Sequence, residues 1–171
     1  CLVTVLSISI QAICQQEKVF LLKQKASENM RFPDSMLYYG NELLKIDDSL
    51  AQAEGFYAKS LAMRQSRQPD SVLPYLLDAQ KVTPKNNPEI QGRVQRMLAS
   101  TYSILKKSDK SLYHADQTVE IAKKTKNDRL LASALGIKAR ANNDLGDYES
   151  AIENWIEAAR LEETFYPNQL P

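Results

Sequence analysis

The side chains that most often do chemistry in proteins are few in this chain and widely spaced. It has one histidine, His114, and two cysteines, Cys1 and Cys14, with no Cys-x-x-Cys pair and no ligand cluster around the histidine. A structural zinc or haem site needs several such ligands together, so we expect no metal and no cofactor. His114 is therefore predicted to be a structural residue on a helix.

Carboxylate pairs and nucleophile motifs give no signal for catalysis either. Asp47–Asp48 and Glu162–Glu163 are adjacent acids at predicted helix ends, whereas hydrolytic acid–base pairs need a partly buried cleft. The sequence contains no Gly-x-Ser-x-Gly, no His-Glu-x-x-His and no glycine-rich phosphate loop. We predict that this segment is not an enzyme.

Composition favours a folded, helix-rich protein. Of the 171 residues, 43% are hydrophobic and 25% are charged, with only five glycines and seven prolines, which is typical of globular domains. The net charge is +1, and binding to a phosphate backbone needs a concentrated basic face. We therefore predict no nucleic-acid partner for this segment.

The first fourteen residues, CLVTVLSISIQAIC, carry no charge and differ from the rest of the chain. The run is shorter than the ~20 residues that span a bilayer and is typical of the apolar part of a signal peptide, cleaved before Gln15. We predict that residues 1–14 are a signal-peptide remnant and that the protein is extracytoplasmic. Two alternatives stay open: a buried first helix or strand of the domain, and lipidation of Cys14.

Beyond this segment the sequence repeats itself. RFPDSMLYYGNELLKI, from Arg31, aligns without gaps with RQPDSVLPYLLDAQKV, from Arg67, and segments starting at Ser108 and Gly146 occupy the same place in later units. Pro-Asp-Ser is typical of a helix start, because Pro fixes φ and Asp or Ser can accept from free backbone N–H groups. Helix breaks are expected near Pro33, Pro69, Ser108 and Gly146.

Each of these segments follows another stretch with helical periodicity. Val94, Met97, Leu98, Thr101 and Tyr102, for example, recur at spacings of three and four. No stretch of useful length alternates at period two, so no strand is predicted. The expected architecture is all-α, with eight helices in four antiparallel pairs at 17–52, 53–91, 92–131 and 132–165.

These patterns resemble tetratricopeptide (TPR) repeats, over residues 17–165. LASTY supplies a Leu-Ala and the Tyr of a first helix, and GDYESAIENWIEAA supplies Gly146, Tyr148, Ala151, Trp155 and Ala158 of the last repeat. The long spacing of the later repeats is similar to a long-helix subtype in membrane-anchored regulators of Bacteroidetes-like bacteria. The resemblance implies a right-handed superhelical solenoid of about four hairpins that binds a protein or peptide.

In TPR proteins the first helix of each hairpin lines a concave groove. Applying that register implies a peptide-binding surface with four arginines, and guanidinium groups bind carboxylates bidentately. We expect it to bind an acidic or C-terminal peptide. The residues that the resemblance places there are Tyr57, Leu61, Arg64, Arg93, Arg96, Ser100, Arg140 and Asn143.

No polar capping helix follows the last repeat, and a repeat needs neighbours on both sides. We expect the array to continue beyond Pro171, leaving Trp155 and Ile156 partly uncovered here and able to support self-association. Three functions are compatible with this layout: the extracytoplasmic sensor or interaction region of a membrane-anchored signalling or transcription regulator, a secreted or lipid-anchored envelope scaffold, and the accessory array of an enzyme. The membrane would be reached only through a downstream segment or the N-terminal signal.

Overall fold

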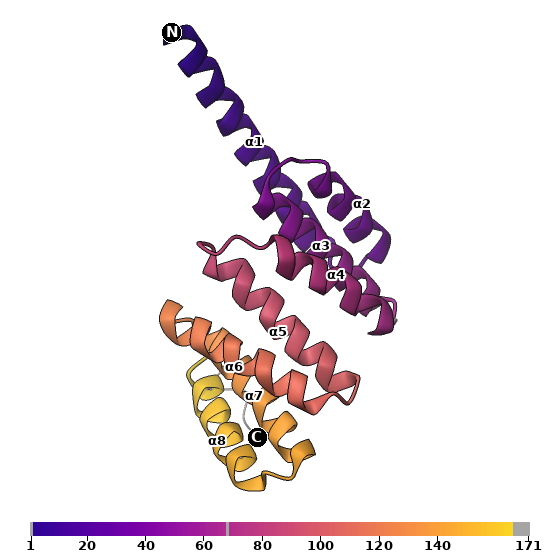
Figure 1. The fold of residues 1–171 in the computed structure, drawn as a ribbon, viewed down its shortest axis with the longest axis vertical. Coiled ribbons are helices and arrows are strands. Elements are labelled where there is room, and N and C mark those ends of the chain that lie inside the picture. The colour runs from indigo at the N-terminus through magenta and orange to yellow at the C-terminus, as the bar shows by residue number, and fades with distance from the viewer. Residues whose placement is uncertain (1, 68, 166–171) are drawn as a thin grey trace. The chain divides into compact units, whose positions relative to one another are not determined.

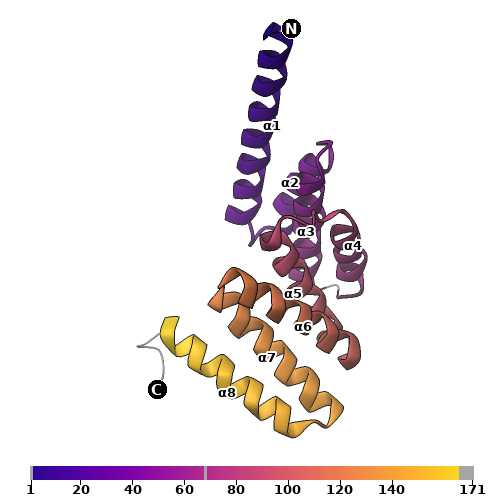
Figure 2. The same ribbon diagram turned by 60° about the vertical axis from the view of Figure 1, so that its left-hand side comes forward.

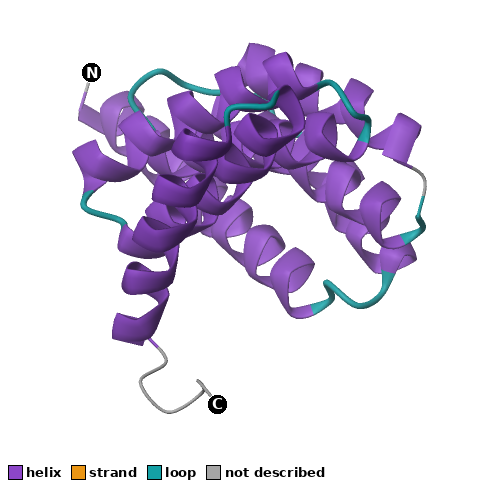
Figure 3. Cartoon of the chain, turned by 90° about the horizontal axis from the view of Figure 1, so that it is seen from below, coloured by secondary structure: helices purple, strands orange, loops and turns teal. Residues whose placement is uncertain are grey.

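A computed structural model describes residues 2–67 and 69–165 of the chain. Within these ranges the chain consists of α-helices joined by short loops, and no strand is found there (Figures 1 and 3). This confirms the predicted all-α class. The helices are α1 (Leu2–Glu28), α2 (Pro33–Leu44), α3 (Ser49–Gln65), α4 (Pro69–Val82), α5 (Pro88–Ile104), α6 (Ser108–Thr125), α7 (Asp128–Leu145) and α8 (Tyr148–Phe165).

The helices form two compact units, Cys1–Val82 with α1 to α4 and Thr83–Pro171 with α5 to α8. In each unit every helix packs against the next one along the chain, and the first helices of the two hairpins, α1 with α3 and α5 with α7, also touch. Figure 2 shows α7 and α8 side by side as one such hairpin. This is the local arrangement that a helical-hairpin repeat requires.

Polar caps fix where the first helix of three hairpins begins. The side chains of Asp48, Asn87 and Asn127 accept hydrogen bonds from the backbone N–H three residues ahead, at 2.7, 3.3 and 3.0 Å. Each bond satisfies one N–H group that has no partner inside the helix. The predicted repeat boundaries at 53, 92 and 132 therefore fall one turn inside α3, α5 and α7.

The second helices begin where the prolines and the small residues predicted. α2 and α4 start at Pro33 and Pro69, α6 starts at Ser108, and Gly146 ends α7 with φ of 87°. In α2 the N-cap is Phe32, which makes no side-chain cap. The expectation that Asp or Ser of the Pro-Asp-Ser step would cap this helix is wrong, because Asp34 and Ser35 stand inside its first turn and the N-cap position is taken by Phe32.

Helix α1 begins at Leu2 rather than near residue 17, and it runs without a break past Cys14 and the predicted cleavage point. Its N-terminal half extends beyond the other helices of the first unit in Figure 1. Farther along, Val19 and Ala26 are buried, and Val19 belongs to a cluster with Leu43, Ile46 and Ala51. No helix among the described residues is long and apolar enough to cross a membrane.

A pair of glycines brings α2 and α3 into close contact. A Cβ atom added to Gly55 would lie 2.8 Å from the carbonyl oxygen of Gly40 and 3.0 Å from Cγ of Leu44. These distances leave no room for a side chain without a shift of backbone. Glycine is therefore required here by the close approach of the two helices, and the first unit depends on it for packing.

Candidate functional site

The residues predicted to line the groove divide between the two units. Tyr57, Leu61 and Arg64 lie on α3 in the first unit. The other five lie on α5 and α7, which pack against each other in the second unit. We call these five the inner stripe: Arg93, Arg96, Ser100, Arg140 and Asn143.

On α3 the predicted surface is largely closed. Tyr57 is only 4% exposed, so it is part of the core and not an accessible groove residue as predicted. Leu61 is half-buried and Arg64 is exposed. One turn before Tyr57, Glu54 is also 4% exposed, because this part of α3 is packed inside the first unit.

An ion pair between α1 and α3 explains how a carboxylate can be buried there. Nζ of Lys23 lies 2.8 Å from Oε1 of Glu54. A buried charge is costly unless it is paired and hydrogen-bonded, so Lys23 makes the burial of Glu54 tolerable. Sequence analysis missed this pair, although a glutamate among small residues in AQAEGFY is a signal of a buried, paired carboxylate.

The inner stripe is more open than α3. Arg140 and Asn143 are exposed, while Arg93, Arg96 and Ser100 are half-buried. Arg93 lies one turn from Glu89, at 3.8 Å between Nη1 and Oε1. Part of the charge of Arg93 is therefore balanced within α5.

The guanidinium groups of Arg96 and Arg140 form no ion pair with any residue that the structure describes. Counted from the caps of α5 and α7, Arg96 takes the same helix position as Gly136, and Ser100 takes the same position as Arg140. Each arginine therefore has a small residue as its counterpart on the neighbouring helix. A Cβ atom added to Gly136 would meet nothing within 4 Å, so there is open space beside the stripe.

The charges around the stripe leave the two arginines available to an anion. Oδ2 of Asp144 lies 3.9 Å from Nζ of Lys106, and Oδ1 of Asp116 on α6 lies 2.7 Å from Nζ of Lys138. The nearby acids are thus occupied by lysines. Two guanidinium groups, with hydroxyl and amide side chains beside them, can donate charge-assisted hydrogen bonds to a carboxylate.

His114 has a structural environment, as predicted. Its Nδ1–H donates to Oε1 of Gln95 at 2.7 Å, and its ring stacks on Tyr102 with centroids 5.3 Å apart. Burial, with a smaller contribution from the ammonium group of Lys110, lowers the pKa of His114. The imidazole therefore joins α5 to α6 in its neutral form. Among the described residues no group of His, Cys, Asp and Glu could hold a metal ion.

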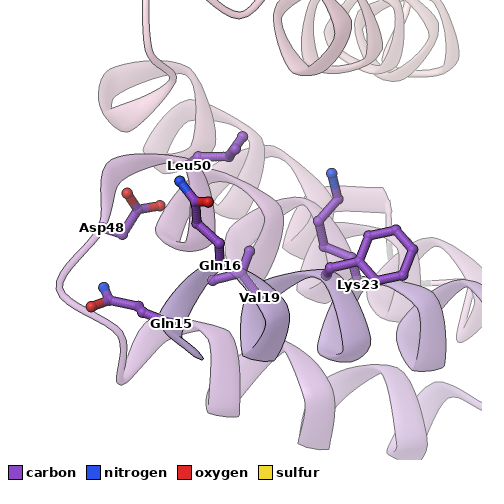
Figure 4. Close-up of a pocket in the computed structure, with 7 residues that line it drawn as sticks. Gln15, Gln16, Val19, Lys23, Asp48 and Leu50 are labelled. Carbon is purple, nitrogen blue, oxygen red and sulfur yellow. The ribbon is translucent and has the colours of Figure 1, made fainter. Parts of the chain in front are cut away.

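A pocket of about 450 Å³ lies in the first unit, between α1 and the start of α3 (Figure 4). Its walls include Val19 and Leu50, and polar groups stand at its edge (Figure 4). Lys23 and Asp48 also line it, but one pairs with Glu54 and the other caps α3. The pocket thus offers mainly apolar contact, and sequence periodicity gave no indication of it.

Comparison with known proteins relates the chain to two proteins of Bacillus subtilis. Response regulator aspartate phosphatase H of strain 168 is 28% identical over 133 residues, which are 76% of this chain and 35% of that protein. The crystal structure of aspartyl phosphate phosphatase F matches with a TM-score of 0.69 and 16% identity, covering 95% of this chain and 45% of that one. The chain thus spans less than half the length of either protein.

A second solved structure, that of MamA protein, matches with a TM-score of 0.54 and 15% identity over 91% of this chain and 98% of that chain. No known protein-family profile matches the sequence. At these identities the likeness to the solved structures concerns the fold. Together with the helix order and the hairpin packing, it shows that this chain has the fold of the TPR-like helical repeat proteins.

Proposed function

We propose that this chain is a non-catalytic module that binds a protein segment, and that the inner stripe of the second unit is its ligand surface. The observation that carries the proposal concerns Arg96 and Arg140, on the packed first helices α5 and α7. Neither forms an ion pair with a residue that the structure describes, and there is open space at Gly136. An acidic peptide, or a peptide with a free C-terminal carboxylate, supplies the opposite charge. The proposal is limited to the second unit, and Arg64 of the first unit is not needed.

The proposed setting is a larger signalling regulator. The relative at 28% identity is named a response regulator aspartate phosphatase, which supports a partner among the proteins of bacterial signal transduction. Its name also favours a second candidate function, in which the chain is the interaction array of a phosphatase. In both cases the described residues bind and orient a partner rather than react with it.

The extracytoplasmic location is a separate proposal. It rests on the uncharged apolar segment at 1–14, which is typical of a signal peptide. N-terminal sequencing of the native protein tests it. A start at Gln15 supports export, and an intact segment from residue 2 to 13 overturns it.

Binding of a fluorescent Glu-Ser peptide with a free carboxylate, followed by anisotropy, tests the ligand surface. We expect affinity to fall as salt rises, since partly exposed charges are screened within ~10 Å at 0.1 M. Replacing both Arg96 and Arg140 with Ala should weaken the free energy of peptide binding by a few kcal/mol, because a charge-assisted hydrogen bond is worth about 1.5–3 kcal/mol.

The matched control replaces Lys124 and Arg160 with Ala, because both are exposed on α6 and α8 and their loss changes the net charge equally. We expect this variant to bind as the parent does. A peptide amidated at its C-terminus shows whether the end carboxylate or the glutamates are recognised. Binding that survives loss of Arg96 and Arg140 would refute the proposed surface.

A further inference from the structure

The pocket beside α1 is large enough to hold a small molecule. Its volume is about 450 Å³, within the range of about 300–1,000 Å³ that is usual for ligand pockets. The walls come from two segments of the first unit, the middle of α1 and the cap and first turn of α3. These segments face each other across the pocket in Figure 4. The space is therefore bounded by described residues of a single unit.

One wall of the pocket is an apolar surface that the protein covers only in part. Val19 is 8% exposed and Leu50 is half-buried, whereas Phe20 is 69% exposed. Burial of such a surface is favourable because it removes apolar area from water. An aromatic molecule suits this wall, since aromatic rings attract one another in offset or edge-to-face geometry.

The charges that line the pocket cancel and are already engaged. Nζ of Lys23 lies 2.8 Å from Oε1 of Glu54, and Oδ1 of Asp48 accepts a hydrogen bond of 2.7 Å from the backbone N–H of Ala51. The other polar groups in the walls are uncharged glutamine amides. A charged ligand would enter this site without a counter-charge of its own, and burying an unpaired charge is costly. The lining therefore favours a neutral ligand.

We propose that this pocket binds a small, neutral aromatic molecule that carries one hydrogen-bonding group. Its ring contacts Val19, Phe20 and Leu50, and its polar group bonds to the amide of Gln16, which can both donate and accept. In Figure 4 the side chain of Gln16 extends from α1 toward Leu50. The site lies in the first unit, so the proposal does not depend on the inner stripe of α5 and α7.

The neutral dye Prodan, a naphthalene that carries one ketone, is the probe for this site. We expect a saturable blue shift of its emission, because the ring leaves water for an apolar surface. Two competitors of similar size then compare charge, since naphthol is neutral at neutral pH and naphthalenesulfonate is an anion. Naphthol should displace Prodan at a concentration at least about tenfold lower, because the sulfonate would be desolvated without a partner.

Three variants test whether the dye occupies this pocket. Phe20→Ala removes part of the apolar wall, and Gln16→Glu replaces the amide with a charge, so each should weaken Prodan binding at least about tenfold. Both side chains are exposed, and circular dichroism should show unchanged folding. The matched control, Phe32→Ala, removes a ring that is 61% exposed outside the pocket and should bind as the parent does.

The outcomes separate a defined site from general adsorption of the dye. Equal losses in Phe20→Ala and Phe32→Ala, or a shift that does not saturate, would mean that Prodan adsorbs to exposed rings. Equal displacement by naphthol and naphthalenesulfonate would contradict a site selective for neutral ligands. Each of these results, or the absence of any emission change, would overturn the inference.

Discussion

Two equivalent positions of the repeat differ in burial between the first and the second unit. Counted from the caps Asp48 and Asn87, Glu54 of α3 takes the position of Arg93 in α5, and Tyr57 takes that of Arg96. Glu54 and Tyr57 are each 4% exposed, whereas both arginines are half-buried at the surface. The repeat register thus identifies equivalent positions but does not show which of them remain accessible.

The difference follows from what each unit places beside those positions. In the first unit α1 reaches α3 through Lys23, whose ammonium group pairs with Glu54. In the second unit α5 carries Arg96 at the helix position where α7 carries Gly136, and a Cβ atom added to Gly136 would meet nothing within 4 Å. The first unit uses these positions for internal packing, whereas in the second unit they remain at the surface, where we propose that a ligand binds.

The largest loss of stability is expected from Lys23→Met in the first unit. It removes the ammonium group that pairs with the carboxylate of Glu54, whose side chain is only 5% exposed. Unfolding free energy in urea should fall by roughly 2–3 kcal/mol, somewhat less than for a fully buried pair because Lys23 is partly exposed. Lys45→Met, which removes a surface pair with Glu42, should change it by less than about 0.5 kcal/mol. Similar losses in both variants would contradict the comparison.

Two matched glycine substitutions compare packing in the two units. Gly55→Ala places a methyl group 2.8 Å from the carbonyl oxygen of Gly40 and should destabilise the protein by about 1–2 kcal/mol, since overpacking outweighs the gain in helix propensity. Gly136→Ala meets nothing within 4 Å and should stabilise it by about 0.5–1 kcal/mol. Thermal unfolding of both variants measures the difference. Opposite signs support the comparison, and a stabilising Gly55→Ala would contradict it.

Much of the fold could be predicted from local signals in the sequence. Pro33, Pro69 and Gly146 act on their own backbone, so the helix ends they predict agree with the structure. The early start of α1 at Leu2 was not predicted, because an uncharged apolar run is compatible with both a signal peptide and a helix.

The surface was less predictable than the fold. The pairing of Lys23 with Glu54 depends on a contact between α1 and α3, which are distant in sequence. The burial of Tyr57 likewise depends on packing by other parts of the chain. A pattern along one helix cannot show whether another helix covers its exposed side. The pocket beside α1 depends on the same contact and was missed for the same reason.

A smaller change in stability, which depends on pH, is expected from His114, the only histidine of the chain. Because burial and Lys110 lower its pKa in the folded protein, the unfolded chain takes up its proton at a higher pH than the folded chain does. Stability should therefore fall as pH drops through the normal histidine range near 6.5, by at most about 1.4 kcal/mol per pH unit.

Urea unfolding at about pH 7.5 and about pH 5.5, on either side of the ordinary histidine pKa, measures this loss. His114→Asn places there the residue type that α8 carries at its equivalent position, Asn154. It should remove most of the pH dependence in this interval. A variant that loses as much stability as the parent between the two pH values would show that another group is responsible.

The smallest effect on folding is expected where the comparison predicts an open surface. Arg96 and Arg140 form no ion pair within the described part of the chain and do not belong to its buried core. Replacing both with Ala should change the free energy of unfolding by less than about 0.5 kcal/mol, as for most surface substitutions. Urea unfolding of this variant beside Lys23→Met measures the contrast between the two units at one set of conditions. A loss above about 1 kcal/mol would mean that the guanidinium groups stabilise the second unit as Lys23 stabilises the first, and the inner stripe would then be a packing surface rather than a ligand surface.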